Sequence, residues 1–112
     1  MLIEPIILEY LKKELNTENV YLEIPTPIPE TFVTIELRDR SKTDHIEAVT
    51  LELMSYAPSM YEAASLDERV RDAMDCAITL DQVMSSKCGG GNNSTDTVNK
   101  KYRYRSYYNL YL

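Results

Sequence analysis

One stretch, residues 31–77, constrains the fold most, because its apolar residues change from the periodicity of a strand to that of a helix. Residues 31–38 are rich in β-formers, a polar run follows, and residues 46–56 alternate between apolar and polar side chains. Beyond them apolar residues recur at helical spacing, and Ser59 and Glu62 have the spacing of a capping box, which is typical of a helix start. The stretch therefore predicts two strands followed by an amphipathic helix, a unit of the α+β class.

The two periodicities also predict which side chains form the core. Alternation gives each strand one inner face, and helical spacing gives the helix one apolar face. The predicted inner residues of the two strands are Val33, Ile35, Leu37, Val49, Leu51 and Leu53. Those of the helix are Ala63, Leu66, Val70, Ala73, Met74 and Ala77. Ile46 and Ala48 fall out of phase with the second strand, which predicts a bulge near Ala48.

The N-terminal elements follow from the same periodicities and from the positions of the prolines. Residues 3–16 have helical spacing, with a proline in the first turn where its missing N–H costs nothing. Residues 19–24 alternate as a half-buried strand, and three prolines make residues 25–29 a stiff connector. The polar run 39–44 is expected to form a loop between two strands.

The C-terminal third of the chain predicts two more strands. Residues 82–87 are expected to form a short strand, and residues 102–112 alternate as a final strand. Residues 89–99 are Gly, Asn, Ser and Thr with few apolar side chains, which predicts a flexible loop. The expected order is α-β-β-β-α-β-β in a single domain, residues 1–112, with a mainly antiparallel sheet of about four to five strands flanked by two helices.

The net charge of -6 is distributed unevenly along the chain. Four of the 12 lysines and arginines lie in residues 100–112, where no acidic residue occurs, so residues 1–99 carry 8 basic and 18 acidic side chains. An acidic body argues against broad binding to a phosphate backbone, and the basic end is expected to meet an acidic protein surface, including a neighbouring copy. No stretch approaches the roughly 18 apolar residues of a membrane span, and no signal peptide is present, so we expect a soluble, intracellular product.

The side chains that could carry chemistry form no recognisable catalytic or metal-binding pattern. His45 has no serine or cysteine nucleophile in a motif context. Cys76 and Cys88 lack CxxC spacing and are expected to be reduced thiols without a function. The three glycines at 89–91 are not followed by the GK[ST] of a phosphate loop. We therefore expect no enzymatic activity, no cofactor, no metal and no small-molecule substrate.

The last strand has the most distinctive composition of the chain, because five of the nine tyrosines lie in its final eleven residues. Three interpretations remain open: a protein interface, a solvated strand, and a platform that stacks single-stranded RNA. Alternation is expected to expose every second side chain of this strand, which is expected to lie at an edge of the sheet. Arg40 of the polar run 39–44 and Arg38, directly before this run, are added to the candidate interface. These candidate residues are Arg103, Arg105, Tyr107, Tyr111, Arg38 and Arg40.

Three segments carry a resemblance to a known family. They are the proline segment leading to FVTIE, the SYAPSMYEAASL junction between strand and helix, and the Arg103-Tyr104 pair that opens the last strand. With these, nearly the whole chain resembles the small tail-terminator and tail-completion proteins of long-tailed bacteriophages and prophages. Two features depart from that family: RDRS follows Leu37 in place of a Gly-rich turn, and Arg105 stands where a glutamine is common.

The resemblance implies both a fold and a function. It implies a curved antiparallel sheet flanked by two helices, with six copies closing a ring that caps the tail tube and joins it to the head connector. The expected partners are then other copies of the chain, the tail-tube protein and the connector protein, and the expected location is the neck of the virion, with no membrane involved. The alternative from the residues alone is a small single-stranded RNA-binding module that uses the Tyr/Arg-rich strand.

Overall fold

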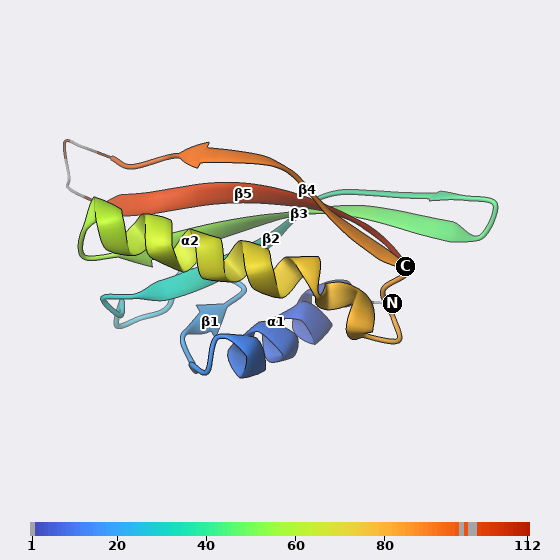
Figure 1. The fold of residues 1–112 in the computed structure, drawn as a ribbon, viewed down its shortest axis with the longest axis horizontal. Coiled ribbons are helices and arrows are strands. Elements are labelled where there is room, and N and C mark those ends of the chain that lie inside the picture. Colours follow the sequence, from blue (N-terminus) through green and yellow to red (C-terminus); the bar gives the residue numbers. More distant parts are fainter. Residues whose placement is uncertain (1, 97, 99–100) are drawn as a thin grey trace.

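The computed structural model describes residues 2–96, 98 and 101–112 and contains two helices and one open, five-stranded sheet (Figure 1). The elements, in chain order, are α1 (Ile3–Glu14), β1 (Val20–Tyr21), β2 (Phe32–Thr43), β3 (Ile46–Ala57), α2 (Met60–Asp75), the 3-10 turn η1 (Ala77–Thr79), β4 (Ser85–Asn93) and β5 (Tyr102–Tyr111). This order confirms the α+β class and the sequence of elements expected above.

The sheet has the strand order β1-β2-β3-β5-β4. Its one parallel pair is β1 with β2, and the other three pairs are antiparallel, so the sheet is mainly antiparallel as predicted. Both helices lie on one face of this sheet, which we call the inner face (Figure 1). The opposite, outer face meets neither helix, and this asymmetry determines where a partner could bind.

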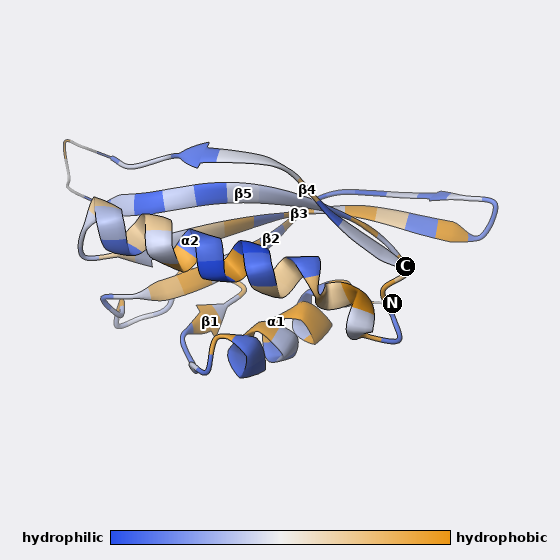
Figure 2. Cartoon of the chain, in the orientation of Figure 1, coloured by the Kyte–Doolittle hydropathy of each residue, from blue (hydrophilic) through white to orange (hydrophobic). Residues whose placement is uncertain are grey.

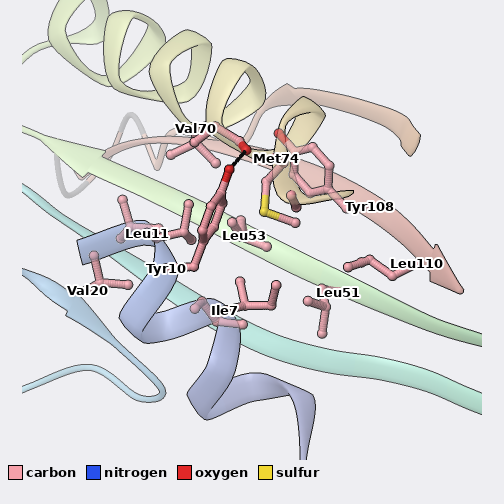
Figure 3. Packing of buried hydrophobic residues seen from close by; sticks show 14 of the residues in the cluster. Ile7, Tyr10, Leu11, Val20, Leu51, Leu53, Val70, Met74, Tyr108 and Leu110 are labelled. Atoms are coloured by element: carbon pink, nitrogen blue, oxygen red, sulfur yellow. Dashed lines mark hydrogen bonds between the residues drawn. The ribbon is translucent and has the colours of Figure 1, made fainter. Parts of the chain in front are cut away.

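The inner face and the two helices enclose the hydrophobic core (Figure 3). The predicted helix residues Ala63, Leu66, Val70, Ala73, Met74 and Ala77 are all buried. The predicted strand residues are buried too, with Leu37 partly so. The Tyr10 hydroxyl donates to the Ala73 carbonyl at 2.7 Å, so α1 is tied to α2 by a buried hydrogen bond. The periodicities therefore identified the core correctly.

The start of α2 confirms the predicted helix cap. Ser59 is the N-cap residue, and its hydroxyl oxygen accepts a hydrogen bond from the Glu62 backbone N–H at 3.2 Å. The same hydroxyl donates to the Glu62 carboxylate at 3.0 Å, which closes the box. Along α2, hydrophobic and hydrophilic residues both occur in successive turns, as expected for an amphipathic helix with one buried side (Figure 2).

The loop predicted at 39–44 is wrong, because β2 continues to Thr43 and only Asp44 and His45 form the turn. Polar side chains do not prevent a strand when both faces of a projecting hairpin meet solvent, so composition misled the prediction. The bulge also lies elsewhere: the register between β2 and β3 shifts between Leu37 and Asp39, and no shift occurs at Ala48. The bulge therefore contains Arg38, one of the candidate interface residues.

The strand predicted at 19–24 is shorter than expected. Only Val20 and Tyr21 pair, in parallel with β2, while Leu22 and Ile24 are exposed. The prolines that begin at Pro25 remove backbone donors and direct the chain away from β2, so the alternating pattern finds no partner beyond Tyr21.

The flexible loop predicted at 89–99 is wrong for residues 89–93, which belong to β4 and pair with β5. Composition suggested a loop, but the glycines have a packing reason. A Cβ on Gly91 would clash with the Arg105 carbonyl oxygen and lie 2.7 Å from an Arg71 guanidinium nitrogen. Gly90 has a φ of 127° at the point where the β4 register shifts, a conformation that favours glycine. Of the rest of the predicted loop, residues 97, 99 and 100 lie outside the described residues.

Candidate functional site

The outer face of the sheet is the surface on which the candidate residues of β5 lie. Alternate residues of a strand point to opposite faces, and Leu51 and Leu53 of β3 are buried beneath the helices. Glu52, between them, therefore belongs to the outer face. In the register, Glu36 of β2 stands opposite Glu52, and Glu52 stands opposite Tyr107 of β5.

Glu52 is the centre of a charge cluster on this face. Its side chain is only 5% exposed, and it lies 2.7 Å from the Arg105 Nε and 3.3 Å from the Arg38 Nε. Arg38 also contacts the Glu36 carboxylate at 3.2 Å. These four residues, which we call the Glu52 cluster, hold two carboxylates and two guanidinium groups. The cluster is therefore neutral, as a buried carboxylate requires.

The bulge in β2 explains how Arg38 reaches Glu52. Leu37 pairs with Leu51 and Asp39 pairs with Thr50, so Arg38 is the extra residue and has no partner opposite it on β3. A bulge re-aims the side chain of the extra residue. Arg38 can therefore approach Glu52 from one side while Arg105 approaches from β5.

Tyrosines and other aromatic residues extend this face on both sides of the cluster. Phe32 stacks on Tyr56 with ring centroids 4.3 Å apart and planes at 6°, and Tyr21 meets Phe32 edge-on at 6.3 Å. On β5, the Arg105 guanidinium donates to the Tyr107 hydroxyl at 3.4 Å. The outer face thus carries aromatic side chains beside a cluster whose charges are paired within it, which is typical of a protein-binding surface.

A cavity of about 170 Å³ with a mainly apolar lining opens beside the aromatic stack, where the proline connector returns to the sheet. Its lining includes Ile24, Ile28 and Pro29 from the connector and Phe32 and Tyr56 from the strands. Ile24 and Ile28, which a shorter β1 leaves outside the core, are thereby brought to the outer face.

The structure brings three of the six predicted interface residues together, namely Arg38, Arg105 and Tyr107. Arg103 lies further along β5 and its Nε donates to the Ser94 carbonyl at 2.7 Å. Tyr111 is at the other end of β5 and is 50% exposed.

Arg40 differs from the other five candidates, because it pairs with the buried Val49 and is therefore on the inner face. Its guanidinium lies 3.8 Å from Glu4 of α1 and 3.4 Å from Glu47. Arg40 thus joins the β2–β3 hairpin to α1 and does not belong to the outer face.

Two further expectations about β5 are wrong. β5 lies between β3 and β4, so it is not an edge strand. Arg103, Arg105 and Tyr107 are half-buried rather than freely exposed, because neighbouring strands flank them on both sides.

The sequence did not identify Glu52 as a candidate residue. A glutamate at a polar position of an alternating strand is indistinguishable in sequence from one that faces water. The one signal in the sequence was the presence of Arg38 and Arg105, which the strand order places next to Glu52.

A second polar cluster lies on the inner face, between α2 and β5. Asp67 is buried, and its carboxylate accepts a hydrogen bond from the Arg71 Nε at 2.9 Å. Burial raises the pKa of Asp67, and the nearby Arg71 and Ser106 side chains oppose that rise. Burial also raises the pKa of the Tyr108 hydroxyl well above its usual value. Arg71 passes over Gly91, so this cluster holds α2 against β4 and β5 and has a structural role.

Of the side chains considered for catalysis, only Cys88 borders a cluster, because it stands opposite Tyr108 in the register. His45 is in the exposed turn between β2 and β3, and Cys76 and Cys88 are exposed, free thiols. Among the described residues, no group of His, Cys, Asp and Glu side chains is arranged to hold a metal ion. Within the same residues, no helix is long and apolar enough to cross a membrane.

Comparison with known proteins adds no family to these observations, because no family model and no curated protein matches this chain.

Proposed function

We propose that this chain is a structural subunit of the head-tail neck of a long-tailed phage or prophage, and that its outer face binds the tail-tube protein. Copies of the chain form a ring that caps the tube and presents another surface to the head connector. The observation that carries the proposal is the outer face itself, which neither helix covers and on which aromatic side chains lie beside the paired charges of the Glu52 cluster.

The Glu52 cluster favours a protein partner over nucleic acid. Binding to a phosphate backbone requires cations that can release counterions, and the strength of binding then falls steeply with salt. Arg105 and Arg38 already contact Glu52, and Arg38 also contacts Glu36. Their charges are therefore compensated within the chain, whereas the tyrosines beside them offer the contact area that protein interfaces use.

The test uses the tail-tube protein encoded in the same gene cluster, immobilised on a biosensor. We expect the wild-type chain to bind it and Tyr111→Glu to lose at least tenfold in affinity, because this change puts a charge on the outer face. Tyr61→Glu is the matched control: Tyr61 is 81% exposed on α2, away from the outer face, and this variant should bind normally.

Three results would contradict the proposal. One is the absence of a tail-tube gene near this one, and a second is equal affinity for the wild type and Tyr111→Glu. The third is salt-dependent retention of the wild type on polyU without binding to tube protein, which would favour the RNA-binding alternative.

A further inference from the structure

At each end of the sheet, within the described chain, a long strand is left without a partner along most or all of one side. At one end, β1 covers β2 only at Val33 and Thr34. In the part of the chain that the structure describes, no strand pairs with residues 35–43 of β2 on the side away from β3. At the other end, β4 pairs with β5 alone. Each end therefore presents a row of backbone donors and acceptors to a further strand.

β4 lacks most of the devices by which proteins protect an edge strand. Such edges usually carry proline or inward-pointing charges, or they are very short. β4 is nine residues long, contains no proline, and has one charged residue, Lys87. Its residues 87–93 are all exposed, and its three glycines leave the backbone accessible. The bulge at Gly89, between Cys88 and Gly90, is the one protective feature, and it divides the edge into two short segments.

The strand directions suit an association between copies. β2 is antiparallel to β3, β3 to β5, and β5 to β4, so β2 and β4 run in opposite directions. Rotation about a ring axis preserves the direction of a strand that runs along that axis. Such a rotation would place β4 of one copy antiparallel to β2 of its neighbour, which is a head-to-tail contact that can close into a ring.

The lengths of the two edges also agree. The open part of β2, residues 35–43, is as long as β4, and it lies partly in the hairpin that projects beyond the helices (Figure 1). A projecting strand can reach a neighbour without a clash between the helical layers. The molecule is 46 Å long and 24 Å in its other two dimensions, which is consistent with this extension.

We propose that copies of this chain associate by sheet extension, with β4 of one copy pairing antiparallel with residues 35–43 of β2 in the next. The proposal rests on the proposed function in that a ring requires such a repeated contact. Sheet extension identifies the two strands through which neighbouring copies contact each other, and it leaves the outer face of the sheet available to the tube protein.

The first test is disulfide crosslinking between the two edges. Cys76→Ser leaves Cys88 as the one native thiol, and Cys88 pairs with the buried Tyr108, so it belongs to the inner face. A second thiol is introduced on the inner face of β2 by Leu37→Cys, Arg40→Cys or Lys42→Cys, one variant at a time, which samples the register. Each variant is oxidised alone and with tube protein.

Heterologous pairing predicts a ladder of crosslinked species larger than dimers for at least one of these variants, with mass spectrometry mapping the bond between Cys88 and the introduced thiol. Ser41→Cys is the matched control, because Ser41 is on the other face of β2 and should crosslink poorly. Two results would overturn the proposal. One is the absence of such bonds in all three variants, and the other is crosslinking that stops at Cys88–Cys88 dimers, which indicates two β4 edges face to face.

The second test removes one backbone donor from the edge. The Ser94 N–H donates to the Arg103 carbonyl at 3.0 Å, so alternation directs the Asn93 N–H away from β5. Asn93→Pro should therefore leave the sheet folded and lower the oligomeric mass measured by light scattering at least twofold. Asn93→Ala keeps the N–H, loses the same side-chain contact to Thr95, and should assemble normally. Normal assembly of a folded Asn93→Pro variant would refute the pairing.

These results separate the two proposals. Rings that crosslink through the edges but do not bind tube protein would refute the proposed function and leave sheet extension standing. Tube-binding complexes without edge crosslinks would refute sheet extension alone.

Discussion

Removing Arg105 from the Glu52 cluster should destabilise the fold, although Arg105 lies on an open face of the sheet. The change is Arg105→Met, which keeps an unbranched side chain of similar length and removes the charge. Arg105 is 34% exposed, but the Glu52 carboxylate that it contacts at 2.7 Å is only 5% exposed. The cost therefore arises mainly from a buried carboxylate that loses its nearer partner.

The size of the effect follows from what remains around Glu52. Removing one partner from a buried ion pair costs about 3–5 kcal/mol when no other cation compensates the remaining charge. Here Arg38 stays 3.3 Å from the carboxylate but is 50% exposed, so it compensates in part. We expect about 1–2 kcal/mol of the free energy of unfolding to be lost in Arg105→Met, and about 3–5 kcal/mol when Arg38→Met is added.

Urea denaturation at pH 7 measures these losses through the transition midpoint, provided that the slope with denaturant is unchanged. Lys13→Met, at an exposed position of α1, is the control and should change the stability by less than about 0.5 kcal/mol. If Arg105→Met is also within about 0.5 kcal/mol of the wild type, Glu52 does not depend on Arg105 and the account of the cluster is wrong.

Three more predictions concern the core and the inner face. Val70→Asp should cost more than about 3 kcal/mol by urea denaturation, because Val70 is fully buried; an unchanged midpoint would mean that α2 packs through another face. Gly91→Ala should cost about 1–3 kcal/mol, since its Cβ would meet the Arg105 carbonyl, whereas Gly89→Ala meets only a side chain and should cost less; equal costs would contradict this packing. Because the pKa of Asp67 is raised, its contribution to stability should be complete below the usual Asp pKa of about 4 and should fall as pH rises through the raised value; Asp67→Asn should remove this fall, and an identical pH profile would refute it.

The sequence predicted those parts of the fold in which one side chain pattern has one structural meaning. Helical spacing in α2, with Ser59 at its start, could only be satisfied by a helix that buries Val70 and Met74. The inner faces of β2 and β3 followed in the same way. The side chain pattern did not predict features that depend on residues distant in the sequence. The glycines of β4, for example, are explained by Arg71 and by the close approach of β5.

In the candidate site, too, local features could be predicted and long-range contacts could not. Alternation placed Arg105 and Tyr107 on one face of the last strand, because this depends on local geometry alone. The strand order could not be derived from alternation, so β5 was assigned to an edge although it lies inside the sheet. Glu52 and Arg38 reach Arg105 only through that order and through the bulge in β2, and neither feature has a local sequence signal.

The most direct test of the account is the growth of tail tubes in the presence of this protein, followed by electron microscopy. Purified tube protein is allowed to polymerise with and without the chain, and tube lengths and tube ends are compared. We expect shorter tubes, each with a closed ring of this protein at one end, and no shortening of the tubes by the Asn93→Pro variant. Tubes that grow to the same length with bare ends would contradict the claim that this chain is a tube-capping subunit.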